Sequence, residues 1–159
     1  SLSLLLKSDL GTNKFTRILI KNTRENKFLG LKEFFEAFQV KTPENFYNNA
    51  DDNFTLFVFS TPLKNQLGLI AKTENQAVLR SIAASWEQTI EGDTNNLFVF
   101  LGKKGTKNPL FQEFTYKGTD VRYLSFTEEN FGIVWAITDN YFIFTSSGES
   151  IVKVIDKIK

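Results

Sequence analysis

Apolar and polar residues form distinct blocks along the chain, and the clearest pattern lies near its end, over residues 131–158. An apolar run at 131–138 is followed by Asp139-Asn140 and by a second apolar run at 141–145. Two apolar runs joined by two turn-forming residues predict an antiparallel hairpin. The residues from Ser146 onward carry a helix-start signal, and the apolar positions after them repeat with a helical period. This segment therefore predicts the order strand, strand, helix.

A second unit with the same order is predicted at about residues 54–90. Residues 54–60 are almost continuously apolar, which is typical of a strand covered on both faces, and residues 66–72 predict its partner. Thr73-Glu74-Asn75-Gln76 matches a capping box. The helix after it, which Gly92 is expected to end, has an apolar stripe formed by Val78, Leu79, Ile82, Ala83, Trp86 and Ile90. The two units, at about 54–90 and 131–158, raise the hypothesis of an internal duplication.

Shorter elements are predicted in the rest of the chain. A helix is expected from the spacing of four apolar side chains, Leu31, Phe34, Phe35 and Phe38. Thr42-Pro43 predicts the start of a second, short helix. Strands are expected at residues 15–21 and, as a hairpin, at 111–117 and 121–126. Residues 96–101 have the composition of a strand but follow a helix closely, so a strand and a short helical turn are both open.

These elements predict one α+β domain over residues 1–159. A hairpin with a single helix cannot bury its apolar faces alone, so the two units are expected to share one sheet. We expect an antiparallel sheet with helices packed on one face, built from the two strand–strand–helix units. A chain of 159 residues is long enough to bury a substantial core.

Composition narrows the chemistry more than it narrows the fold. The chain contains no His and no Cys. It therefore offers no imidazole for acid–base catalysis or metal binding, no thiolate and no disulfide. The formal net charge is +1, with acidic and basic residues intermixed, whereas nucleic-acid binders usually concentrate basic residues on one face. We expect no cofactor, no metal ion, no catalytic residue and no nucleic-acid partner.

Carboxylates offer the main alternative to this expectation. Glu87, Glu91 and Asp93 lie close together in sequence, and the spacing of Glu87 and Glu91 places them on one face of a helix. Two acids held across a cleft are the machinery of glycoside hydrolysis, so a hydrolase or carbohydrate-active enzyme is one hypothesis. A solvated helix face is the simpler interpretation. Asp51-Asp52 lacks the ligand spacing of a calcium loop and predicts an acidic turn.

Two further motifs carry candidate chemistry. Ser150-Ile151-Val152-Lys153 matches a Ser-x-x-Lys pattern, but no supporting motif accompanies it, and we interpret it as the start of a surface helix. Residues 102–109 predict a loop that carries Lys103, Lys104 and Lys107. Its glycines lack the spacing of a phosphate-binding P-loop. These three lysines are candidate contacts to an anionic ligand, such as an acidic lipid headgroup or a nucleic acid.

Several segments together resemble a known group of proteins. They are Trp86-Glu87 late in the long helix, Arg122-Tyr123-Leu124, and the run at residues 141–150. Over residues 30–158 the chain resembles uncharacterised bacterial proteins that have an amino-terminal membrane anchor and an extracytoplasmic α+β domain. The resemblance brings no catalytic residues, and it implies that the full-length protein is anchored and exported. The apolar run at residues 2–6 is far shorter than the roughly 20 residues that span a bilayer.

The sequence thus leads us to expect a non-enzymatic binding or assembly module, the soluble domain of a cell-envelope protein whose partner is another envelope protein. Two alternatives remain open. One is a carboxylate-based hydrolase or carbohydrate-active enzyme that uses Glu87 and Glu91. The other is a weak anionic-ligand binder that uses the loop from Lys103 to Lys107.

Overall fold

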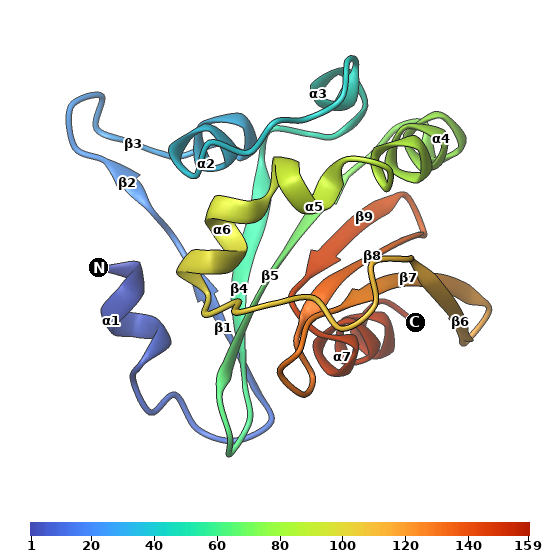
Figure 1. Cartoon of the computed structure of the whole chain (residues 1–159). Coiled ribbons are helices and arrows are strands. Elements are labelled where there is room, and N and C mark those ends of the chain that lie inside the picture. The colour runs from blue at the N-terminus through green and yellow to red at the C-terminus, as the bar shows by residue number, and fades with distance from the viewer.

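A seven-stranded sheet forms the centre of the protein (Figure 1), whose computed structural model describes residues 1–159. The strand order is β1-β4-β5-β9-β8-β7-β6, and every neighbouring pair is antiparallel. The predicted antiparallel α+β fold is therefore confirmed. The bounds of these strands are β1 Lys14–Ile18, β4 Phe54–Ser60, β5 Asn65–Lys72, β6 Gln112–Tyr116, β7 Thr119–Ser125, β8 Gly132–Thr138 and β9 Tyr141–Thr145. A small separate hairpin joins β2 (Lys21–Asn22) to β3 (Lys27–Phe28).

Seven helices accompany the sheet. Their bounds are α1 Leu2–Leu6, α2 Leu31–Ala37, α3 Phe46–Asn49, α4 Gln76–Trp86, α5 Ile90–Asp93, α6 Asn95–Phe100 and α7 Gly148–Ile158. The ambiguous segment at 96–101 is thus helical, and α1 lies where no element was predicted. The predicted cap of the long helix is wrong by two residues, because Asn75 accepts the Val78 N–H while Thr73 accepts the Asn75 N–H in the preceding turn. The start of α7 agrees with the prediction, with Ser147 as its N-cap.

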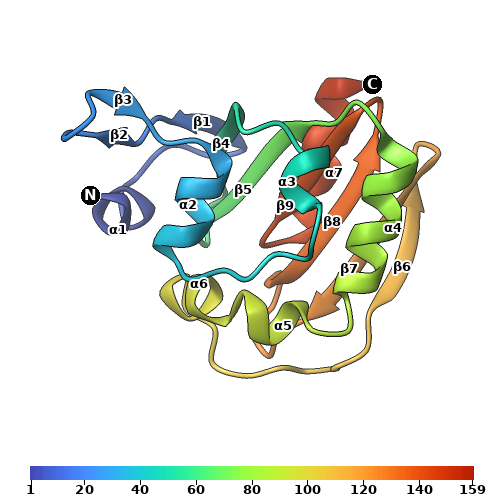
Figure 2. The same ribbon diagram turned by 90° about the horizontal axis from the view of Figure 1, so that it is seen from above.

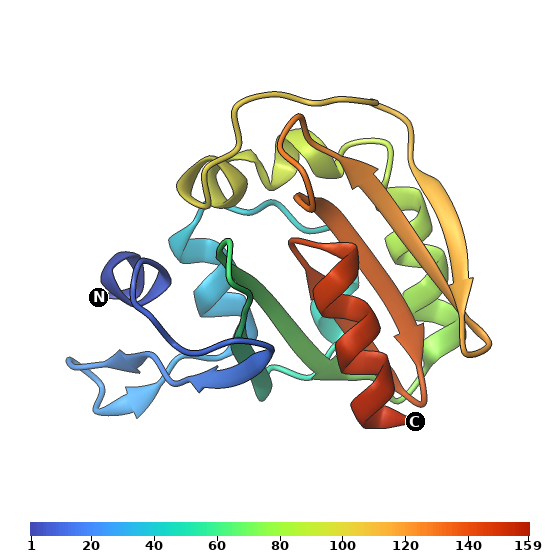
Figure 3. The ribbon, with the colours of Figure 1, turned by 90° about the horizontal axis from the view of Figure 1, so that it is seen from below.

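The helices cover both faces of the sheet, so the prediction that they lie on one face is wrong. Side chains of α2 to α6 pack in the larger core with Ile133, Trp135 and Ile137 of β8, whereas α7 packs in a second core with Val134 and Ala136 of the same strand. The views from above and from below show α7 on the side opposite α4 (Figures 2 and 3). The central strands are apolar on both faces, and each apolar face needs a cover to exclude water.

The structure does not show an internal repeat, although β4-β5-α4 and β8-β9-α7 follow the same order. β5 and β9 are antiparallel neighbours at the centre of the sheet. The rotation that would place β5 on β9, and β4 on β8, is a half-turn about an axis perpendicular to the sheet. Such a rotation keeps a helix on the face of the sheet where it started. Since α4 and α7 lie on opposite faces, no rotation superposes the two units on each other.

Candidate functional site

Glu87 follows the last residue of α4, and strands of the sheet hold its carboxylate. Arg122 on β7 donates from Nε and Nη2 over 2.9 and 2.6 Å, and the Trp135 Nε1–H on β8 donates over 3.0 Å. The Glu87 side chain is only 12 % exposed. These hydrogen bonds with Glu87 are the main reason why the pKa of Arg122 lies above its ordinary value. Two parallel bonds from one guanidinium fix a carboxylate firmly, so Glu87 fastens α4 to the sheet.

Glu91 has different partners. Its carboxylate accepts a hydrogen bond from the Lys103 Nζ at 3.2 Å and another from the Thr106 hydroxyl. Lys103 also donates to the Asn95 side chain over 3.1 Å, and its Nζ lies 4.8 Å from the centre of the Phe126 ring. Glu91 therefore ties the loop after α6 to α5.

Asp93 also serves a structural contact. It accepts hydrogen bonds from the Trp86 Nε1–H at 2.9 Å and from the Thr89 hydroxyl at 2.7 Å. The interpretation of these three acids as a solvated helix face is thus wrong. Glu87 and Glu91 do not share a helix face either, because α4 ends at Trp86 and Glu91 belongs to α5.

The three lysines of the predicted basic loop differ in their surroundings. The Lys103 side chain is only 10 % exposed and pairs with Glu91 as described above. Lys104 and Lys107 are exposed. The loop is tied to β7 by the Lys107 N–H, which donates to the Ser125 carbonyl over 3.0 Å. The structure therefore leaves two of the three predicted lysines facing solvent, and ligand contact by Lys104 and Lys107 stays a prediction.

The Ser-x-x-Lys pattern does not form a catalytic pair. Ser150 is fully buried and its hydroxyl contacts the Ser147 hydroxyl at 2.8 Å, while Lys153 is exposed. Ser147 also donates to the Gln66 Oε1 over 2.5 Å. This buried polar group joins the start of α7 to β5.

The acidic segment after α3 lies in a polar groove of about 700 Å³. Asp52 accepts the Lys32 N–H over 3.0 Å at the start of α2, and Asp51 accepts the Asn53 N–H over 3.0 Å. Both side chains therefore support local backbone structure. No group of three or more Asp or Glu side chains is arranged to hold a metal ion.

The largest cleft, of about 800 Å³, opens beside the turn between β4 and β5. It lies between residues 3–12, the turn at residues 61–65 and the end of α6 at residues 100–102. Asn65 holds the first of these walls, because its Nδ2 donates to the Leu6 and Ser8 carbonyls over 2.8 Å each. Two apolar side chains lining the cleft reach solvent: Leu63 is 88 % exposed and Phe100 is 40 % exposed.

A smaller pocket of about 220 Å³ also borders this turn. Lys64 lines both spaces, and its Nζ lies 3.9 Å from the centre of the Phe131 ring. Burial lowers the pKa of the Lys64 ammonium below its ordinary value, and the Glu128 carboxylate offsets part of this change. The sequence places residues 61–65 between two predicted strands and indicates nothing more about them, since no local pattern shows that Phe131 is a neighbour.

No protein family, no curated protein and no solved structure matches the chain. None of its helices has the length and apolar character needed to cross a membrane. The sheet and the helices packed against it define the class of the chain as an α+β domain. The resemblance to anchored bacterial proteins stays a prediction.

Proposed function

We propose that the chain is a non-enzymatic binding or assembly module. The observation that supports this function is the cleft of about 800 Å³ at the β4–β5 turn, which exposes Leu63 and Phe100 among mostly polar residues. Exposed apolar side chains rimmed by polar groups are typical of surfaces that bind a partner. Three segments distant in sequence form the cleft, and Asn65 joins two of them.

The contacts of the carboxylates favour binding over the alternative of a hydrolase. An acid pair needs two carboxyl groups that face a common substrate. Here the Glu87 oxygens face Arg122 and Trp135, and the Glu91 oxygens face Lys103 and Thr106. Neither acid lines the clefts at the β4–β5 turn.

The proposal includes a place in the cell envelope and a partner there, and the resemblance of residues 30–158 to anchored bacterial proteins supports this part. Fractionation of the producing cells, combined with protease treatment of intact cells, tests it. Digestion of the domain from outside the inner membrane is the expected result, and full protection by that membrane would contradict it.

The binding role can be tested by affinity capture from envelope fractions. We expect a partner that binds the original chain saturably and is lost after Leu63→Ser or Phe100→Ser. Leu110→Ser is the matched control, because Leu110 is also highly exposed but lies outside the cleft. Turnover of a glycoside or ester that disappears in Glu87→Gln, with the fold intact, would instead support the hydrolase.

A further inference from the structure

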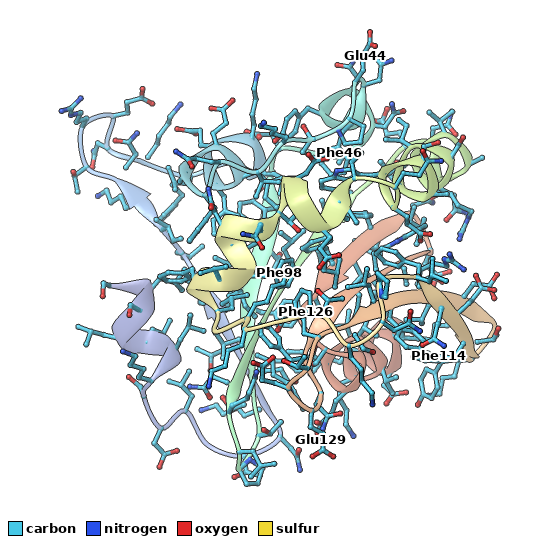
Figure 4. All side chains as sticks on the ribbon, in the orientation of Figure 1. Glu44, Phe46, Phe98, Phe114, Phe126 and Glu129 are labelled. Carbon is cyan, nitrogen blue, oxygen red and sulfur yellow. The ribbon has the colours of Figure 1, made fainter.

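The smaller pocket at the β4–β5 turn is built from three segments that are far apart in sequence. Its walls are residues 61–64 with Gln66, Glu129-Asn130 in the loop between β7 and β8, and Glu149 in the first turn of α7. Figure 4 labels Glu129 on this loop, at the lower edge of the molecule. The pocket volume of about 220 Å³ suits a ligand of a few non-hydrogen atoms.

Lys64 supplies a positive charge that makes no salt bridge in the protein. The side chain is half-buried and its Nζ lies over the Phe131 ring. Burial lowers the pKa of this amine because the charged form loses hydration, and the Glu128 carboxylate offsets only part of this change. A bound anion would supply the missing ion-pair partner.

Gln66 supplies a second donor. Gln66 is only 2 % exposed, yet it lines the pocket. The Oε1 accepts the Ser147 hydroxyl, whereas the Nε2 makes no hydrogen bond within the protein and is not enclosed by it. The Nε2 group is therefore free to donate to an acceptor in the pocket.

The first turn of α7 supplies further donors. Ser147 accepts the Ser150 N–H with its side chain and the Ile151 N–H with its carbonyl. The N–H groups of Gly148 and Glu149 have no acceptor in the protein. The amino end of a helix favours an anion through such free N–H groups and through the helix dipole. This helix has 11 residues.

Two carboxylates also line the pocket, and they limit which anion fits. Glu149 is half-exposed and Glu129 is exposed. They would repel a ligand that is only negative, but they can accept hydrogen bonds from an ammonium group. We propose that this pocket binds a small zwitterion, with its carboxylate toward Lys64, Gln66 and the start of α7 and its ammonium toward Glu129 and Glu149. A free α-amino acid has this chemistry.

This ligand class deepens the proposed function and rests on it, because the pocket and the larger cleft share the turn between β4 and β5. The test is a ¹H–¹⁵N NMR titration of the full chain with glycine, with acetate and methylamine as partial probes. We expect glycine to shift the amides of Gln66, Gly148 and Glu149 saturably, at least about tenfold more tightly than either partial probe.

Lys64→Met and Glu149→Gln separate the contribution of the cation from that of the carboxylate, and Lys104→Met is the control. Lys64→Met should weaken glycine binding about tenfold or more, while the exposed Lys104→Met should leave it unchanged. Glu149→Gln should weaken glycine binding but strengthen acetate binding, because it removes a negative charge from the pocket. This opposite pair of changes does not arise from a general loss of fold.

Three results would overturn the inference. One is the absence of saturable shifts at these three amides, and another is acetate binding as tightly as glycine. Glycine shifts confined to residues 3–12 and 100–102 would also overturn it, while leaving the binding function of the larger cleft in place. Failure to capture an envelope partner, with glycine bound at Lys64, would contradict the proposed function alone.

Discussion

Arg122 and Glu87 face each other across 35 positions of sequence, and two hydrogen bonds of 2.9 and 2.6 Å join them. The pair connects the end of α4 to β7, and the Trp135 Nε1–H binds the same carboxylate from β8. A residue that sequence analysis raised as a catalytic candidate therefore connects a helix to two strands.

Glu87→Gln should lower the free energy of unfolding by about 1–3 kcal/mol, because it weakens three hydrogen bonds and leaves the Arg122 charge without its main partner. Urea unfolding followed by circular dichroism measures this change. Glu44→Gln is the matched control, since Glu44 is exposed and makes no salt bridge (Figure 4). Equal midpoints for the two variants would contradict the role assigned to Glu87.

Gly68→Ala should destabilise the sheet by about 1–3 kcal/mol through overpacking. Gly68 is paired with Phe57 on β4, and a Cβ at this position would overlap the Phe57 ring. Gly92→Ala is the control, because no atom lies near a Cβ built there. We expect the control to change the free energy of unfolding by no more than about 1 kcal/mol, in the stabilising direction. Equal thermal midpoints for Gly68→Ala and the original chain would show that the ring moves away at no cost.

Ser147→Ala should cost about 1–2 kcal/mol of stability, because it removes the side-chain acceptor of the Ser150 N–H and the bond to Gln66. Hydrogen exchange should increase first in α7. Ser85→Ala serves as a control on the exposed side of α4. If the amides of α7 remained as protected as in the original chain, the cap would not stabilise this helix.

Acid should weaken the contact between α7 and the hairpin β6–β7. Asp156 accepts a hydrogen bond from Lys117 and another from the Tyr116 hydroxyl, each over 2.7 Å. The bond from Lys117, and after it the bond from Tyr116, lowers the pKa of Asp156 below its ordinary value of 3.8. A group whose pKa is lowered by folding contributes stability above its unfolded pKa and loses it as the pH falls through the folded pKa.

The measurement for this contact compares the original chain with Asp156→Asn at a series of pH values. The stability difference should be constant near neutral pH and should shrink below about pH 3.8. A difference that grew on acidification would reverse the sign and contradict the assignment. Asp120→Asn is a suitable control, because Asp120 binds Thr115 within its own hairpin.

Local signals predicted the local structure well. Asp139 and Asn140 were expected to form a two-residue turn, and both have positive φ, of 51° and 64°, as the tight hairpin turn requires. The start of α7 was expected from the same kind of short-range chemistry, and the observed N-cap, Ser147, lies one residue after Ser146, where the predicted signal begins. Such features depend on residues within four positions of one another, so the sequence states them directly.

Long-range relationships were the ones that the sequence did not reveal. The continuous apolar run of β4 indicated cover on both faces, yet the pattern does not say which helix lies on which side; α7 occupies the face of Phe57 and Phe59. The contact of Lys64 with Phe131 likewise depends on how two hairpins are placed in the sheet. Side-chain patterns fix neither strand order nor the side on which a connection crosses.

The position of β9 has a consequence for how the protein is made. β9 lies at the middle of the sheet and joins the hairpin of β4 and β5 to that of β7 and β8, but it is the last of these seven strands in chain order. Until it leaves the ribosome, the earlier hairpins have no shared partner, and their apolar edges stay open. The nascent sheet is therefore most vulnerable to aggregation after β8 has emerged and before β9 has, and a premature stop before residue 141 would release two unconnected halves of a sheet.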